Sequence, residues 1–297
     1  MNGGGFMEIC PECRPCLERL VELTVELATD DPRLRREAHD EALAIISREF
    51  APGAIPALIA NKFHLAIQEA SGNPDPFARR KASETAYLAR MYARVAPGYP
   101  ANLTSLIKLA AVGNALDFFR SRAEMTRDIL ADVDLGAADF PSLEKRLSGP
   151  PGLMLYLADN AGEQFFDRPL LEYLRGLGWQ ILYVIKGGPI QNDLTREDLE
   201  ASGVGAALLP VVESGARTVG LVLKEVSPQF LRIYSQAQII IAKGMGHFET
   251  LSRTRDPRLF FLLQAKCRPV AQALGVPRGT FVFQHAPGIS LDTQPAG

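Results

Sequence analysis

Up to about residue 147, apolar positions recur along the chain at the spacing of amphipathic helices. Within residues 16–28, Leu17, Leu20 and Val21 fall on one stripe, which is the pattern of a helix that buries one face. We therefore expect an all-helical N-terminal domain over residues 1–148. Its further helical segments are each bounded by Gly, Pro or Asn, residues that commonly end helices, and occupy residues 31–50, 57–72, 76–97 and 102–119.

The pattern changes after the SGPPG sequence at residues 148–152. Residues 152–160, GLMLYLADN, contain a short continuous apolar run, which is typical of a strand buried on both faces of a parallel sheet. The alternation of such runs with helical segments predicts a Rossmann-like α/β/α sandwich with a mostly parallel sheet over residues 149–297. The further apolar runs occupy residues 179–189, 206–212, 237–246 and 279–284, and the helical segments occupy 166–178, 195–203, 219–226, 228–236 and 256–275.

Polar residues and glycines directly follow the predicted strands. Right-handed crossovers place the carboxyl ends of parallel strands at one edge of the sheet, and ligands bind at that edge. We therefore expect these residues to meet in one crevice. They are Asp159 and Asn160 after the first strand, Lys186 and Gly188 after the second, Asp193 on the loop that follows, and Lys243 after a later strand.

Three of these residues carry the hard oxygen ligands that divalent cations prefer. Asp159, Asn160 and Asp193 suit magnesium or manganese, and sites of this kind also accept cobalt or nickel according to availability. The competing interpretation is a helix start, with Asp159 or Asn160 as the N-cap and Glu163 completing a capping box. The charged residues at the neighbouring strand ends favour the metal site.

A metal beside several cations predicts the hydrolysis of a phosphate ester. The metal would polarise the phosphoryl group and activate a water molecule, which Glu163 or Asp193 could orient. Lys243 and Lys186 would neutralise the phosphate oxygens, and glycines such as Gly188 would let backbone N–H groups approach them.

Three of the four cysteines, Cys10, Cys13 and Cys16, lie in a CPECRPC segment, whereas Cys267 is remote in the sequence. In a reducing compartment this spacing suggests a second metal site or redox chemistry. A tetrahedral metal would require the two ends of the chain to meet. The alternative is that these thiols are small buried residues next to a helix.

Composition restricts the kind of partner. The formal net charge is −2, and basic residues are interspersed with acidic ones, which does not suit a nucleic-acid-binding surface. The first residues lack the pattern of a secretory signal, and no apolar run reaches the length of a membrane span. We expect a soluble cytoplasmic protein that acts on a small phosphorylated metabolite. The sequence does not indicate an oligomeric state.

Several short segments follow one another in order from Cys13 to Cys267. They are ECRPCL, SGNPDPF with Lys81, NLTSLIKLAAVGNALDF, LADNAGE, KGGPIQND with Thr195 and Asp198, AKGMGHFETL and QAKC. In these segments the chain resembles the metal-dependent damage-control phosphatases, formerly a family known only as a domain of unknown function. This resemblance implies that the protein removes phosphate from small metabolites such as sugar phosphates or damaged cofactor intermediates, and that a helical N-terminal region packs on a Rossmann-like domain.

The resemblance also implies roles for individual residues. The chain combines Cys13 and Cys16 near its start with Lys266-Cys267, and in this it resembles a microbial branch of the family. This resemblance implies that the cysteines meet in space. The implied site consists of a metal on Asp159, Asn160 and Asp193, a motif acid at Glu163, a phosphate contact from Lys243, and support from Asn114 and Asp117 of the helical half.

His247 departs from the family pattern, in which asparagine is typical after KGxG. Taken alone, this histidine is a candidate for a ligand, a general acid or a structural loop residue, and a lone histidine most often has the last role. We hypothesise that the substitution His247→Asn alters the pH profile of the reaction but retains activity.

Two other functions compete with phosphate hydrolysis. A Rossmann-like domain would also suit a carboxyl methyltransferase that uses S-adenosylmethionine, an activity claimed within the resembling family. However, Asp159 and Asn160 occupy the first turn, where a nucleoside site usually has glycines. The second competitor is a non-catalytic module that binds a phosphorylated metabolite and senses redox state through its cysteines.

Overall fold

A computed structural model describes residues 7–115, 119–131 and 133–286 of the 297-residue chain. The first half forms helices where the apolar periodicity predicts them, and several begin at a capping residue. The Asp31 carboxylate, for example, accepts hydrogen bonds from the amides of Arg33 and Leu34, which satisfies N–H groups that a helix start leaves free. The helices before the second strand are α1 Cys13–Ala28, α2 Pro32–Glu49, α3 Pro56–Ser71, α4 Ala78–Val95, η1 Ala96–Gly98, α5 Leu103–Gly113, α6 Arg122–Leu130 and α7 Phe140–Leu147.

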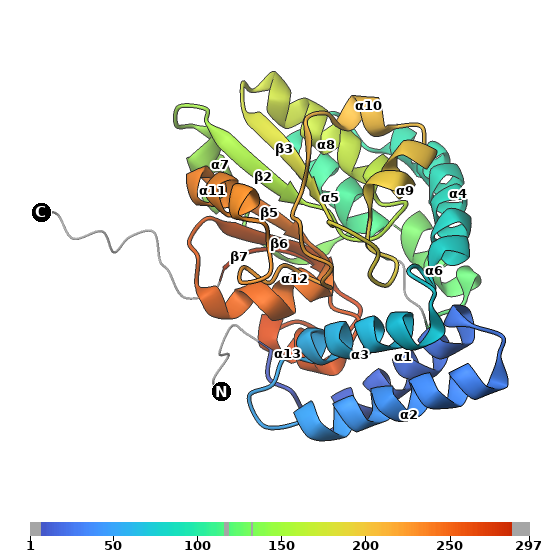
Figure 1. Ribbon diagram of the computed structural model, residues 1–297. Helices are drawn as coiled ribbons and strands as arrows, with labels where there is room; N and C mark the ends of the chain where they lie inside the picture. Colours follow the sequence, from blue (N-terminus) through green and yellow to red (C-terminus); the bar gives the residue numbers. More distant parts are fainter. Residues whose placement is uncertain (1–6, 116–118, 132, 287–297) are drawn as a thin grey trace, which may run out of the picture.

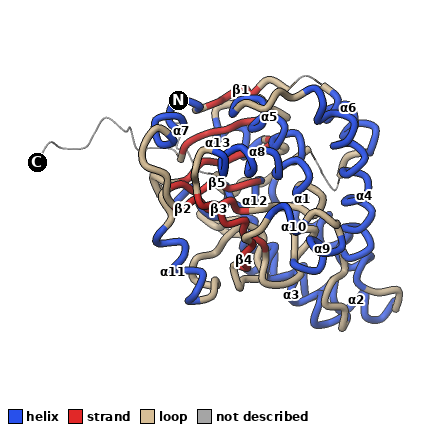
Figure 2. The backbone as a smooth tube through the Cα atoms, turned by 90° about the horizontal axis from the view of Figure 1, so that it is seen from above, coloured by secondary structure: helices blue, strands red, loops and turns tan. Residues whose placement is uncertain are grey.

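A seven-stranded sheet forms the centre of the molecule, with the strand order β1-β7-β6-β5-β2-β3-β4. Strands β2 to β6 pair in parallel, whereas β7 runs antiparallel to β6 and pairs in parallel with β1. Figure 2 shows β1 and β4 at opposite edges of this sheet. The strands are β1 Leu135–Ala138, β2 Leu153–Leu157, β3 Gln180–Ile185, β4 Val211–Glu213, β5 Ile239–Lys243, β6 Leu259–Gln264 and β7 Phe281–His285.

Helices connect the strands of the second half, so the predicted α/β fold with a mostly parallel sheet is confirmed. The connecting helices are α8 Gln164–Gly176, α9 Arg196–Ala201, α10 Gly205–Leu208, α11 Pro228–Gln236, α12 Gly244–Leu251, η2 Ser252–Thr254 and α13 Arg268–Leu274.

The structure corrects the expected helix over residues 256–275. That segment contains β6 and only then α13. All six residues of β6 are buried, because the run lies inside the sheet with helices on both sides. Periodicity alone does not separate a short, fully buried strand from a buried helical segment.

Three smaller differences concern other segments. Residues 219–226 form turns instead of a helix, and the Val219 amide bonds to the side chain of Asn61. The strand expected over residues 206–212 is split, because α10 ends before Pro210 and β4 begins after it. Strand β1 lies within the region expected to be entirely helical, where it adds to the sheet beside β7.

Alternate residues of each strand point to opposite faces of the sheet, and each face has its own core. Met154 and Tyr156 of β2 pack on the side covered by α4, α5 and α8, whereas Leu155 and Leu157 pack on the side of α12 and α13. Helices α1 to α3 form a third, separate core and lie together at one end of the molecule (Figure 1). Since α4 to α6 share a core with the sheet, the boundary near residue 148 stays a prediction.

Candidate metal and phosphate site

Two segments at the carboxyl edge of the sheet carry the predicted metal ligands. The turn after β2 contains Asp159 and Asn160, and the loop after β3 contains Asp193. The Leu194 amide donates to the Asp159 carbonyl at 2.8 Å, and an isolated antiparallel bridge joins Asn160 to Asp193. The three residues are therefore held side by side by their own backbone.

Asp159, Asn160 and Asp193 line one cavity of about 710 Å³. This volume lies within the range that holds small ligands and cofactors. The other walls come from α1, α3, α12 and the start of α13. The cavity thus lies between the first helices of the chain and the carboxyl edge of the sheet.

Asn114, which follows α5, links two carboxylates at this edge. Its Nδ2 donates to Asp159 Oδ2 at 2.8 Å and to Glu163 Oε1 at 2.9 Å. Asn160 Nδ2 donates to the same two oxygens at 2.7 and 2.6 Å. The backbone amide of Gln264 in turn donates to Asn114 Oδ1 at 3.2 Å. These bonds engage one oxygen of Asp159 and the nitrogen of Asn160, so the second carboxylate oxygen and the amide oxygen remain for a ligand.

Three buried carboxylates, those of Asp159, Glu163 and Asp193, act on one another. Burial, followed by repulsion from Glu163 and Asp193, raises the pKa of Asp159 to about 8. Burial raises the pKa of Asp193 to about 6, against the attraction of Lys186. Burial on its own would raise the pKa of Glu163, but the charge of Lys243 holds that pKa below its usual value. Because buried like charges disfavour ionisation, the cluster favours a bound cation.

Lys243 lies behind these carboxylates instead of in the cavity. Its side chain is fully buried, with Nζ 2.7 Å from Glu163 Oε2, 2.7 Å from Asp167 Oδ1 and 2.8 Å from the Ala110 carbonyl. Asp167 and the Ala110 carbonyl accept hydrogen bonds from the ammonium group, and Glu163 pairs with its charge. This geometry makes Lys243 a residue that positions Glu163, which differs from the phosphate contact expected from the sequence.

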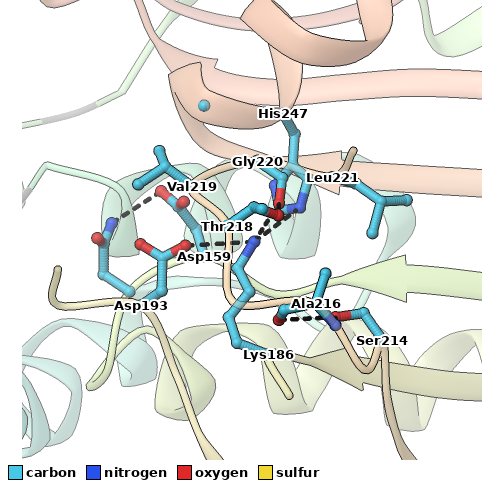
Figure 3. Close-up of polar contacts among 12 residues, drawn as sticks. Asp159, Lys186, Asp193, Ser214, Ala216, Thr218, Val219, Gly220, Leu221 and His247 are labelled. Atoms are coloured by element: carbon cyan, nitrogen blue, oxygen red, sulfur yellow. Dashed lines mark hydrogen bonds and ion pairs between the residues drawn. The ribbon is translucent and has the colours of Figure 1, made fainter. Parts of the chain in front are cut away.

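Lys186 and His247 form a second buried pair, shown in Figure 3. Lys186 Nζ lies 2.5 Å from the Gly220 carbonyl, 3.2 Å from Asp193 Oδ2 and 3.4 Å from His247 Nε2. His247 Nδ1 lies 2.6 Å from the Lys243 carbonyl, so Nδ1 carries the proton and Nε2 accepts from Lys186. Burial and then Lys186 lower the pKa of His247 well below its usual value. The histidine is therefore a neutral residue that orients Lys186.

Two other residues were predicted for the site, Gly188 and Asp117, and neither is among the described residues of the cavity wall. Gly188 is on the β3 loop, where a Cβ atom would press on the side chain of Arg217, and it is not among the described residues that line the cavity. Asp117 falls outside the described residues.

Lys266 lines the cavity, although in the sequence it stands out only as part of the KC segment. Its charge acts on both Asp159 and Glu163. A strand over residues 259–264 would have placed Lys266 at the same sheet edge as the other strand-end residues. The helix expected over residues 256–275 concealed this signal.

Cys13, Cys16 and Cys267 line the same cavity as the carboxylates, and Cys10 Sγ lies 3.8 Å from Cys13 Sγ. All four cysteines are thiols and not disulfides. Burial raises the pKa of Cys13 and of Cys267 to about 12. Within the described residues, no group of three or more His, Cys, Asp or Glu side chains is arranged to hold a metal ion. A redox role for these cysteines stays a prediction.

The donor set at the carboxylate edge suits a hard divalent ion. It offers only two carboxylates, Asp159 and Asp193, beside the amide of Asn160, but magnesium and manganese commonly bind through one or two carboxylates and complete their shell with water and phosphate oxygens. Gly244 adds a second indication, since a Cβ atom there would overlap the Asp159 carboxylate. A glycine at this position keeps open the space that the carboxylate needs.

A mostly parallel sheet with clustered carboxylates at its carboxyl edge is the arrangement of α/β proteins, a class in which ligands bind at that edge. Residues 9–282 match the family model described as the damage-control phosphatase ARMT1-like domain. The protein belongs to this family.

Relatives of full length support this assignment. The chain is 35% identical over 283 residues to the damage-control phosphatase PH1575 of Pyrococcus horikoshii. The aligned region covers 93% of this chain and 97% of the relative. It is 30% identical to a damage-control phosphatase of Archaeoglobus fulgidus, with 93% and 98% covered. The crystal structure of PH1575, a DUF89 family protein, matches this fold with a TM-score of 0.83 over 94% of this chain and 99% of that chain. No helix among the described residues is long and apolar enough to cross a membrane.

Proposed function

We propose that the protein is a phosphatase that hydrolyses small phosphate monoesters with the help of a divalent ion held by Asp159, Asn160 and Asp193. The observation that carries this proposal is the meeting of these three residues at one wall of the 710 Å³ cavity. The names of the relatives in Pyrococcus and Archaeoglobus support phosphatase activity. We infer substrates of the class of sugar phosphates or damaged cofactor intermediates.

Each residue of the site has a distinct part in the proposed reaction. A divalent ion at the three ligands would polarise the phosphoryl group and lower the pKa of a bound water. Lys186 holds the Asp193 carboxylate in place. Glu163 accepts from the Asn160 amide nitrogen and so turns the amide oxygen of that residue outward as a ligand. Lys266 lies at the cavity wall, where its charge would stabilise the phosphate oxygens in the transition state.

The test is an assay of p-nitrophenyl phosphate with magnesium, manganese, cobalt or nickel after removal of bound metal. We expect turnover only with a divalent ion, and a loss of at least about 100-fold in kcat for Asp159→Asn and for Asp193→Asn, since removal of one electrostatic group of a site costs on the order of 100-fold or more. The matched control is Asp40→Asn, because the Asp40 side chain is exposed on α2. Turnover that survives both substitutions would exclude this site.

The phosphatase assay, together with calorimetry, separates the two competing functions. A binding module would take up phosphate esters without turnover in any metal. A methyltransferase would bind S-adenosylmethionine tightly without metal, which calorimetry measures directly. Either result, together with absent phosphatase turnover, would replace the proposed function.

A further inference from the structure

Helix α4 lies against the turn that carries Asp159 and Asn160. A Cβ atom on Gly162 would lie 2.9 Å from the Leu88 side chain and 3.1 Å from the Cα atom of Thr85. Gly162 also has a φ of +102°, a conformation that favours glycine. The backbone of the turn therefore packs directly against Leu88 and Thr85 of α4, with no side chain of the turn in between.

The same helix holds the loop that carries Asp193. The Asn192 side chain, directly before Asp193, donates to Glu84 Oε2 at 3.1 Å. One helical turn earlier on α4, Lys81 Nζ lies 2.6 Å from Asp198 Oδ2 and 2.7 Å from Asp75 Oδ2. In Figure 1, α4 stands beside α9, the helix that contains Asp198 and ends this loop.

Asp198 connects Lys81 to the end of the loop. Its carboxylate accepts from the backbone amide of Thr195 at 3.2 Å and from the Thr195 hydroxyl at 2.7 Å, so one carboxylate bonds both to α4 and to the residue two positions after Asp193. Lys81 is only 1% exposed. A buried ion pair is weak evidence of stabilisation, because desolvation offsets the attraction, but it fixes the relative position of the two segments that it joins.

We propose that Lys81 and Glu84 are positioning residues, which make α4 the common support that sets the separation of Asp159 and Asp193 for a shared metal ion. The inference rests on the proposed function in one respect, namely that these two aspartates bind a metal together. Residues behind a metal ligand typically contribute about 10- to 100-fold to metal affinity. The expected effect of losing Lys81 is therefore on metal binding first.

The experiment measures Mn²⁺ binding to the metal-free full-length protein by calorimetry. We expect Lys81→Met to raise the Kd for Mn²⁺ by about 10-fold or more, Lys81→Arg to restore part of the affinity, and excess Mn²⁺ to recover most of the lost activity. Lys62→Met is the matched control, because Lys62 lies on α3 with its side chain 53% exposed; its Kd should equal that of the unaltered protein.

Glu84→Leu decides the question if Lys81→Met does not fold. It removes the acceptor of the Asn192 side chain and leaves Lys81 in place, and we expect a smaller rise in the Kd for Mn²⁺. Unchanged Mn²⁺ affinity in the folded α4 variants would overturn this inference alone, provided that Asp193→Asn abolishes binding. If the unaltered protein binds no Mn²⁺, the proposed function fails, and this inference fails with it.

Discussion

The two ends of the cavity differ in the groups that surround their buried side chains. At the carboxylate cluster, formed by Asp159, Glu163 and Asp193, amide nitrogens and lysines contact the buried oxygens at 2.6 to 3.2 Å. At the cysteine cluster, formed by Cys10, Cys13, Cys16 and Cys267, burial raises the pKa of two thiols to about 12.

The carboxylate cluster is the end that is arranged for chemistry near neutral pH. Asp159 and Glu163 each accept two hydrogen bonds from amide nitrogens, and such bonds hold a group in one geometry before any ligand arrives, as preorganised electrostatic catalysis requires. A thiol acts as a nucleophile or metal ligand only as the thiolate, and burial in apolar surroundings suppresses that form. The cavity therefore has one end with hydrogen-bonded carboxylates and one end where burial keeps Cys13 and Cys267 as thiols.

The largest expected effect is on stability, and it follows from replacing Lys243 at the carboxylate end. The substitution Lys243→Met leaves the buried carboxylates of Glu163 and Asp167 without their shared cation, and breaking a buried pair in this way costs about 3–5 kcal/mol. We expect the free energy of unfolding, measured in urea, to fall by that amount. The control is Lys224→Met, since Lys224 is exposed.

A double variant tests the cause of the loss. Adding Glu163→Gln to Lys243→Met removes one uncompensated charge, so part of the stability should return. If the double variant were as unstable as the sum of its single variants, or if Lys243→Met behaved like Lys224→Met, the ion pairs of Lys243 would not be what orders the carboxylate end.

The adjacency of the candidate metal ligands was predictable because it depends on topology. The apolar run of β2 is buried on both faces, and β2, β3 and β5 are parallel neighbours, so the residues after them share one edge. The backbone bridge between Asn160 and Asp193 is a direct result of that arrangement. No knowledge of side-chain contacts was needed.

The sequence did not predict where the side chains of the strand-end lysines point. A lysine after a strand has the same pattern whether it faces a cavity or the core behind it. The partners of Lys243, Asp167 and the Ala110 carbonyl, come from α8 and α5, and that of Lys186, the Gly220 carbonyl, comes from a distant loop. Contacts between segments so far apart depend on packing, which hydrophobic periodicity does not encode.

A smaller effect is expected at His247, and here the structure changes the hypothesis drawn from the sequence. Since this histidine is neutral and accepts from Lys186, His247→Asn should lower kcat/KM by about 10-fold or less, as expected for an indirect contact. The pH profile between 6 and 9 should keep its shape, measured as kcat/KM for p-nitrophenyl phosphate. A shift of the acidic limb would show that His247 titrates during the reaction.

The smallest effect on activity is expected at the cysteine end. Iodoacetamide alkylates the thiolate form, so at pH 7.5 the exposed Cys16 should react well before Cys13 and Cys267, as followed by mass spectrometry. Cys13→Ser and Cys267→Ser should leave kcat nearly unchanged if the cysteine end takes no part in the reaction. Equal labelling of all three residues would contradict the protection that burial gives.

Alkaline stability gives an independent measure of the same protection. The pKa of Cys267 rises on folding from 9.0 to about 12, so its contribution to stability is complete below pH 9 and disappears as the pH rises toward 12. In the unaltered protein the free energy of unfolding should therefore decline over this interval, and Cys267→Ser should make the decline shallower. An identical slope in both proteins would mean that the Cys267 thiol ionises as readily in the fold as in the unfolded chain, which would remove the contrast between the two ends of the cavity.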